Sequence, residues 1–106
     1  MQELDNSGWS RALEDFYHRR LLDPQEDAKI RSHALERMKS KPSWRNIAAE
    51  IQLIQGDVSD DLLRDATLAL RARNPKGLVF SPGSGERAHV VNEWTQWWQK
   101  NSNRKD

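Results

Sequence analysis

Catalysis or metal binding needs titratable side chains at suitable spacings, and the histidines are the first candidates. His18, His33 and His89 fall in three different predicted helical segments, and none has a second histidine four residues away. Glu86 and His89 have the i, i+3 carboxylate–histidine spacing of helical di-iron sites. Such a site needs a second copy of this motif and two further glutamates, and we find no second copy. We interpret His89 and His18 as surface or helix-end histidines, and we predict no metal and no cofactor.

Nucleophilic and phosphate-binding motifs are equally sparse. The serines stand where helix caps or loops explain them, and the sequence has no Gly-x-Ser-x-Gly elbow. The segment "PGSGE", residues 82–86, has two glycines but lacks the third glycine of a dinucleotide site and the lysine of a P-loop. Gly83–Gly85 could present N–H groups to an anion or nucleotide, although a loop with Ser84 as helix cap explains the same residues. We therefore predict that the protein is not an enzyme and has no catalytic residues.

The composition narrows the class of protein further. The chain of 106 residues has no cysteine, which excludes disulfides, thiolate metal sites and cysteine nucleophiles. The net charge of +1 supplies no global attraction to nucleic acid or anionic membranes, so such binding would need a local patch. No apolar run approaches the roughly 20 residues of a membrane span, and the acidic N-terminus is unlike a signal peptide. We expect a soluble, cytoplasmic protein without a membrane partner.

The pattern of apolar residues predicts an all-α fold, a compact bundle of about five short helices. We expect a single helical domain over residues 1–100, followed by a tail over 101–106. The first segment, 5–22, begins at Asp5 or Ser7 as N-cap and carries an apolar face that includes Trp9, Ala12, Leu13 and Phe16.

Capping residues predict where the next helices begin. Asp23 is placed as an N-cap, with Pro24 as the first residue of the second helix. The third helix lies in the segment 43–57, with Gly56 as its C-terminal stop, and its apolar stripe from Trp44 to Ile54 is the clearest in the chain. Ser59 caps the fourth helix, which ends before Asn74-Pro75.

The last segment contains three of the five tryptophans. Its apolar residues span only about 120° at helical spacing, which predicts a helix over roughly 85–100; they are Val90, Val91, Trp94, Trp97 and Trp98. A small extended segment or β-hairpin near 78–91, as in a winged helix, is the alternative. If the segment is helical, Trp94 belongs to the core, Trp97 lies at its rim, and the face packs against the third helix.

Basic residues form two groups that could bind nucleic acid. Lys29, His33, Arg37 and Lys41 recur every four residues, and Arg45 follows them. A second group, Arg71, Arg73 and Lys76, comes after the fourth helix. Lying side by side, the groups could hold a nucleic-acid backbone. The fourth helix is a poor recognition helix, because its N-terminal residues Ser59, Asp60 and Asp61 would meet phosphates.

One stretch resembles a known family. Val58-Ser59, Ala66, Arg73 and Ser81-Pro82-Gly83 fall at spacings similar to a stretch in lambda-type phage replication proteins that load the helicase. The resemblance covers a minor part of the chain, and the aromatic residue expected soon after the Ser-Pro-Gly loop arrives late, at Trp94. It implies a phage- or plasmid-type replication accessory protein.

The leading functional hypothesis is a small non-enzymatic binding protein, an adaptor or regulator that acts through protein–protein contacts. Its partner is another protein or a second copy of the chain, and Trp97 and Trp98 are the candidate contact residues. The alternative is a nucleic-acid-binding regulator, or a replication accessory protein, that uses the basic face of the second helix.

Overall fold

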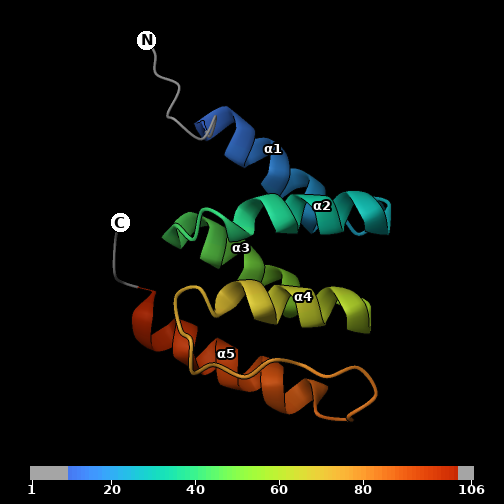
Figure 1. Ribbon diagram of the computed structural model, residues 1–106, viewed down its shortest axis with the longest axis vertical. Coiled ribbons are helices and arrows are strands. Elements are labelled where there is room, and N and C mark those ends of the chain that lie inside the picture. The colour runs from blue at the N-terminus through green and yellow to red at the C-terminus, as the bar shows by residue number, and fades with distance from the viewer. Residues whose placement is uncertain (1–9, 103–106) are drawn as a thin grey trace.

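The computed structural model describes residues 10–102, in which five helices and no β-strand are found. The helices are α1 (Arg11–Leu22), α2 (Ala28–Lys39), α3 (Trp44–Ile54), α4 (Asp60–Leu70) and α5 (Arg87–Asn101) (Figure 1). The predicted all-α bundle is therefore confirmed. The hairpin alternative near 78–91 is wrong, because α5 is continuous and residues 78–86 pair with no other segment as a strand.

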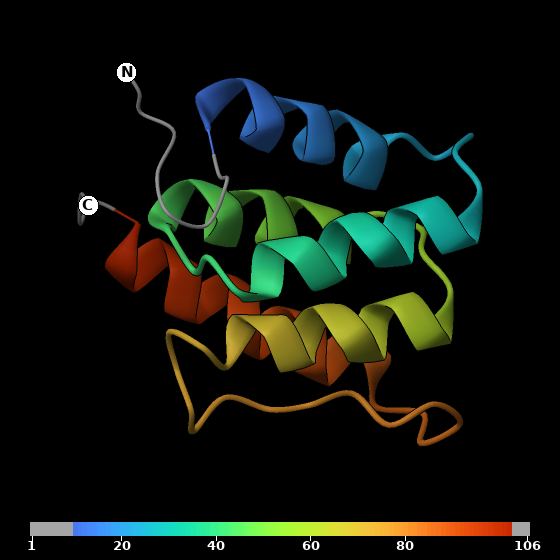
Figure 2. The same ribbon diagram turned by 45° about the horizontal axis from the view of Figure 1, so that its top comes forward.

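The helices α1 to α4 pack around one another, and α5 packs against α3 and adds Val90 and Trp94 to the same core. Neighbouring pairs are α1 with α2, α2 with α4, α4 with α3, and α3 with α1. α1 and α3 run in one direction, whereas α2, α4 and α5 run in the other (Figure 2). The long connection over 71–86 passes alongside α4 and α5 before α5 begins. The C-terminal ends of α2, α4 and α5 therefore lie at the same end of the molecule as the start of α3.

Serine caps begin three of the helices. Ser10, Ser43 and Ser59 each accept a hydrogen bond from the backbone N–H three residues later, which satisfies a donor that the helix itself leaves unpaired. The predicted starts of α3 and α4 are confirmed. The proposed caps Asp5 and Ser7, and the apolar Trp9, lie outside the described residues.

The predicted start of α2 is wrong. The helix begins at Ala28 with Asp27 as N-cap, and the Asp27 carboxylate accepts the N–H of Lys29 at 2.7 Å. Asp23 instead ends α1 as its C-cap in an extended conformation, and its Oδ1 accepts the N–H of Gln25 at 2.9 Å. This local turn uses the aspartate that would otherwise have capped a helix starting at Pro24.

Two features of α5 also differ from the sequence prediction. Ser84 is not its N-cap: Glu86 holds that position without a side-chain bond, and the Ser84 hydroxyl accepts the N–H of Glu86 at 3.2 Å. The helix also continues to Asn101, one residue beyond the expected end of the domain.

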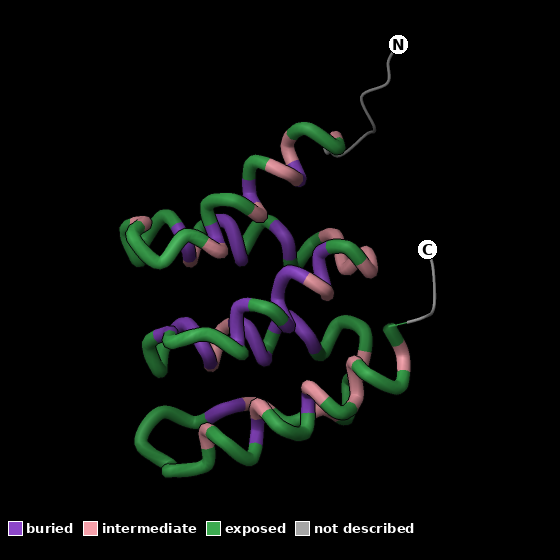
Figure 3. The backbone as a smooth tube through the Cα atoms, turned by 180° about the vertical axis from the view of Figure 1, so that it is seen from behind, coloured by how far each residue is buried: buried purple, intermediate pink, exposed green. Residues whose placement is uncertain are grey.

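The core is built from the inward faces of all five helices (Figure 3). Its largest fully buried apolar side chains are Leu21, Leu35, Met38, Ile47, Ile54, Leu63, Leu70 and Trp94. The predicted apolar face of α1 is partly wrong, because Phe16 is 42% exposed beneath the Arg20 guanidinium, whereas Tyr17 and Leu21 point into the core. Across residues 10–102, no helix has the length and apolar character needed to cross a membrane.

Candidate binding site at the tryptophan end

Four tryptophans gather where the C-terminal half of α5 meets the start of α3, and we call Trp44, Trp94, Trp97 and Trp98 the tryptophan cluster. The Trp44 and Trp97 rings are stacked, with centroids 5.9 Å apart and planes at 28°. Trp98 lies 6.1 Å from Trp44, and Trp94 meets Trp97 edge-on at 5.3 Å. The predicted packing of the α5 face against α3 is confirmed, with Trp94 1% exposed and Trp97 and Trp98 half-buried.

Trp94 also fixes the connection that precedes α5. Its indole N–H donates to the Leu78 carbonyl oxygen at 2.7 Å, so the buried ring leaves no polar atom unsatisfied. Gly77 lies flat against the same ring, since a Cβ atom at this position would come within 2.2 Å of the indole. Two residues after Leu78, the N–H of Phe80 donates to the Thr67 hydroxyl of α4 at 3.0 Å. The segment 77–80 is thereby held to both α4 and α5.

A cleft of about 290 Å³ opens between this segment and α5, and we call it the α5 cleft. Its apolar surface comes from Leu78, Trp94 and Trp97. Three charged side chains line it as well: Lys76 from the connection, and Glu93 and Lys100 from α5. Each of the three is exposed to solvent. The cleft thus combines an aromatic floor with two cations and one anion within reach of a ligand.

Arginines from the end of α4 brace this region. The Arg73 guanidinium lies 4.6 Å from the centre of the Trp44 ring, and its Nε donates to the Pro42 carbonyl oxygen at 2.5 Å. Arg71 donates from Nε to the Pro75 carbonyl oxygen at 2.9 Å. Both residues are exposed, so their charges remain on the surface while their hydrogen bonds shape the adjoining turns.

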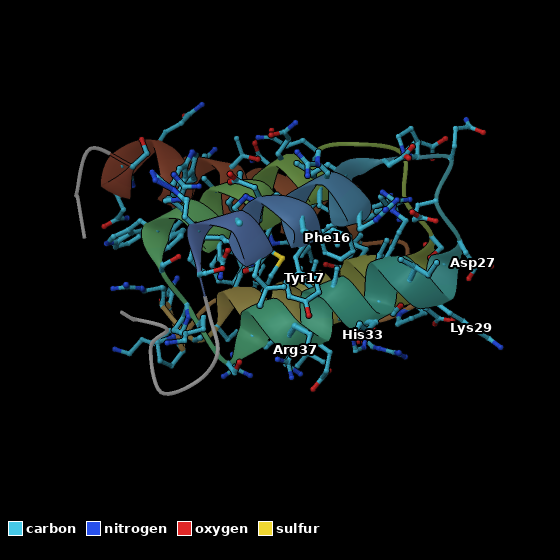
Figure 4. All side chains as sticks on the ribbon, turned by 90° about the horizontal axis from the view of Figure 1, so that it is seen from above. Phe16, Tyr17, Asp27, Lys29, His33 and Arg37 are labelled. Carbon is cyan, nitrogen blue, oxygen red and sulfur yellow. The ribbon has the colours of Figure 1, made fainter. Side chains whose placement is uncertain are left out.

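The predicted basic stripe on α2 lies on an exposed surface. Lys29, His33 and Arg37 lie along one exposed side of α2 (Figure 4). The His33 ring approaches Tyr17 edge-on, with centroids 6.3 Å apart. Lys41 is half-buried in the turn between α2 and α3.

Arg45 does not continue this stripe. Its Nε donates to Glu14 Oε1 at 2.5 Å and its Nη2 to Asp15 Oδ1 at 3.0 Å, so it joins α3 to α1. The turn after α2 directs the first residues of α3 toward α1, which explains why the four-residue repeat does not extend across it.

The two predicted basic groups meet only at their C-terminal ends. Because α2 and α4 run in the same direction, the turn after α2 lies beside the end of α4, as the hydrogen bond from Arg73 to Pro42 shows. Lys41 and Arg73 therefore approach the same end, whereas Lys29 lies near the opposite end of α2 (Figure 4).

Sequence reasoning missed a buried polar layer on α3. Asn46 is fully buried, its Oδ1 lies 2.6 Å from His18 Nε2, and its amide donates to the Lys41 carbonyl oxygen at 2.6 Å. His18 is therefore a half-buried partner of Asn46 rather than a surface residue. Glu50 is 1% exposed, and burial raises its pKa to about 8, against a smaller lowering by Lys39. The sequence did contain a signal for this buried carboxylate, because Glu50 lies between Ile47 and Ile54 within the apolar stripe of α3.

Within the described residues, no three histidine, aspartate or glutamate side chains converge as a metal ion requires. The chain matches no family model, no curated protein and no solved structure at a significant level.

Proposed function

We propose that this protein is a small non-enzymatic binding protein that acts through protein–protein contacts at its tryptophan end, the surface formed by the tryptophan cluster with Arg73, Lys76 and Lys100. The observation that carries the proposal is the half-buried state of Trp97 and Trp98 beside exposed cations. Tryptophan and arginine are the residues that most often dominate the energy of protein interfaces. An adaptor or regulator would present such a surface.

The packing of the rings favours a protein partner over stacked nucleobases. Base stacking needs an open aromatic face. Here the Trp44 ring is stacked on Trp97 and also carries the Arg73 guanidinium, while Trp94 meets Trp97 edge-on. Protein side chains can pack against rings that are partly covered in this way, and the exposed Arg73, Lys76 and Lys100 lie in the same region. The exposed cations favour an acidic partner.

The test is alanine substitution at Trp98. The half-buried ring packs on Trp44, so its removal should leave the helical circular dichroism spectrum native. Partner binding or self-association should weaken by at least about thirtyfold, the effect of a residue worth about 2 kcal/mol in an interface. Sedimentation velocity measures self-association, and quantitative affinity enrichment followed by titration of the purified partner measures binding.

The matched control is His89→Ala, an exposed position on the same helix. This variant should bind as the wild type does. Unchanged association by Trp98→Ala, or loss of the helical spectrum in place of loss of binding, would refute the interface role of the tryptophan end.

A second candidate function is nucleic-acid binding by the outer face of α2, as expected for a nucleic-acid regulator or replication accessory protein. It is favoured by the exposure of Lys29, His33 and Arg37 along one side of the helix (Figure 4). Neither Lys29 nor Arg37 forms a salt bridge with another residue in the described part of the chain.

Fluorescence anisotropy with a labelled short DNA duplex tests this second function. Binding should weaken steeply between roughly 50 and 200 mM salt, because each neutralised phosphate releases counterions. Arg37→Ala and Lys41→Ala should each weaken binding and lower the salt slope by about one, whereas Arg64→Ala, whose cation pairs with Asp61 and Asp65 on α4, should not. Salt-independent binding, or none at low salt, would exclude the function.

A further inference from the structure

We propose that the α5 cleft binds an extended acidic peptide segment of a partner protein, with one apolar side chain seated against Trp97 and a neighbouring carboxylate held by Lys76 and Lys100. This inference rests on the proposed protein-binding function and names the chemistry that the tryptophan end recognises.

The size of the cleft fits one side chain of a peptide. Its volume of about 290 Å³ is at the lower limit of pockets that enclose a whole small molecule. Its apolar surface, from Leu78 and the two indoles, is suited to a single aliphatic or aromatic side chain. Asn74 and Gln96 on the same lining supply amides of the kind that bond to a peptide backbone.

The wall of the cleft is formed before any ligand arrives. The hydrogen bond from Trp94 to the Leu78 carbonyl and the close contact of Gly77 with the indole hold the connection in place. A preformed wall reduces the ordering cost of binding, which matters for a short peptide with few contacts.

The charges give the site a direction. Glu93, Trp97 and Lys100 are spaced i, i+4 and i+7 on α5, so they follow one another along one face of the helix over about 10 Å. Lys76 adds a second cation from the opposite wall. A carboxylate is therefore attracted to the Lys100 end and repelled at the Glu93 end. A bound segment would place its apolar residue at Trp97 and its acidic residue toward Lys100.

The same charges disfavour a nucleic-acid backbone in the cleft. A strand lying along α5 would bring a phosphate against the Glu93 carboxylate. Of the two rings that line the cleft, Trp97 is already stacked on Trp44, and Trp94 meets Trp97 edge-on and is 1% exposed. An acidic peptide needs only one anionic contact and one apolar contact, and the cleft supplies both.

Amide chemical shifts of the isotopically labelled full chain test the proposal. The probe is a blocked pentapeptide with leucine at its centre and aspartate or glutamate on either side. It should move the amides of residues 74–78 and 93–100 and saturate in the millimolar range, whereas a pentapeptide with lysines in place of the acids should not. Lys100→Glu should weaken binding on the order of tenfold, because it replaces attraction with repulsion. Glu86→Lys, an exposed change beyond the cleft lining, is the charge-reversal control and should bind as the wild type.

Each contrary result overturns the inference. Absence of shifts with the acidic peptide, shifts at other residues, or equal binding of the lysine peptide would do so. A single-stranded oligonucleotide that moves the cleft amides when the peptide does not would assign the cleft to nucleic acid instead. The two proposals can be told apart: a partner whose binding is lost in Trp98→Ala but unchanged in Lys100→Glu keeps the proposed function and removes the cleft from it.

Discussion

Two glutamates are buried among residues 10–102, and their surroundings differ. Glu14, 6% exposed, accepts hydrogen bonds from Arg45 Nε at 2.5 Å and from the Ser43 hydroxyl at 3.4 Å. Glu50, 1% exposed, has an Oε1 atom with no hydrogen-bond partner among the described residues. Burial of the Glu50 carboxylate favours its neutral form more than Lys39 favours the charged form, which is why the Glu50 pKa rises from 4.5 to about 8.

This raised pKa makes the stability of the fold depend on pH. The folded state holds the Glu50 proton more tightly than the unfolded state, so the contribution of this protonation to the stability of the fold is fully present below about pH 4.5. This contribution of Glu50 to stability is lost as the pH rises from 4.5 to about 8. Over that range the unfolded chain releases the Glu50 proton, whereas the folded chain retains it until the pH reaches about 8.

We predict that Glu50→Gln stabilises the protein at pH 8. The amide has nearly the same shape and carries no charge, so the free energy of unfolding should increase by up to roughly 3–5 kcal/mol at pH 8 and change little at pH 5. Urea denaturation of the wild type and of Glu50→Gln at both pH values measures the difference in their free energies of unfolding. Titration of the histidines affects both proteins equally, so it cancels in this difference. Glu86→Gln, at an exposed position, should show no such trend. A Glu50→Gln difference that is equal at both pH values would contradict the prediction.

At the scale of the elements, the N-terminal end of α5 is held by contacts with other segments rather than by its own N-cap. Its N-cap residue makes no side-chain hydrogen bond. Arg87, the first helical residue, instead donates from Nη1 to Asp60 Oδ1 at 3.1 Å and from Nη2 to the Val58 carbonyl oxygen, which ties it to the start of α4. Its middle is fixed by Trp94 through Leu78 and Gly77. The 71–86 connection and α5 therefore depend on one another.

We predict that Gly77→Ala loosens this connection. The new methyl group would lie 2.2 Å from Trp94 Cζ2, and the buried ring cannot move without losing its hydrogen bond. The free energy of unfolding should fall by about 1–3 kcal/mol or more, the cost of overpacking a core. Urea denaturation measures it. Gly56→Ala is the matched control, since its added carbon would meet only Leu53 O at an ordinary 3.4 Å. Equal stabilities of the two variants would show that Gly77 does not clamp Trp94.

At the scale of the molecule, the directions of the helices place basic and acidic residues at opposite ends, although their charges nearly cancel in the chain as a whole. The helices α2, α4 and α5 run in the same direction, and their last turns or C-caps are basic, at Arg37, Lys39, Arg71 and Lys100. The starts of α2 and α4 are acidic, at Asp27, Asp60 and Asp61. Acidic residues at the start of a helix and basic residues at its end interact favourably with the helix dipole. Together they give the molecule a basic end, beside the tryptophan cluster, and a more acidic end, despite a net charge of only +1.

The sequence by itself determined the helices with strong local signals. Ser43 and Ser59 mark the starts of α3 and α4 because a serine hydroxyl can bond to the first free backbone N–H groups. The narrow apolar stripe of α5 placed Trp94 in the core. Both signals depend on neighbours along the chain, which is why they can be read without the fold.

Tertiary structure decided what local signals left ambiguous. Asp23 and Asp27 could both cap α2, and the end of α1 engages the first of them. Phe16 and Tyr17 could both face inward, and packing against α2 selected Tyr17. The joining of Arg45 to α1, and the meeting of Lys76 and Lys100 in one cleft with Trp97, depend on how helices far apart in sequence cross. Burial and charge pairing among such helices are properties of the packed bundle, so only the tertiary structure determines them.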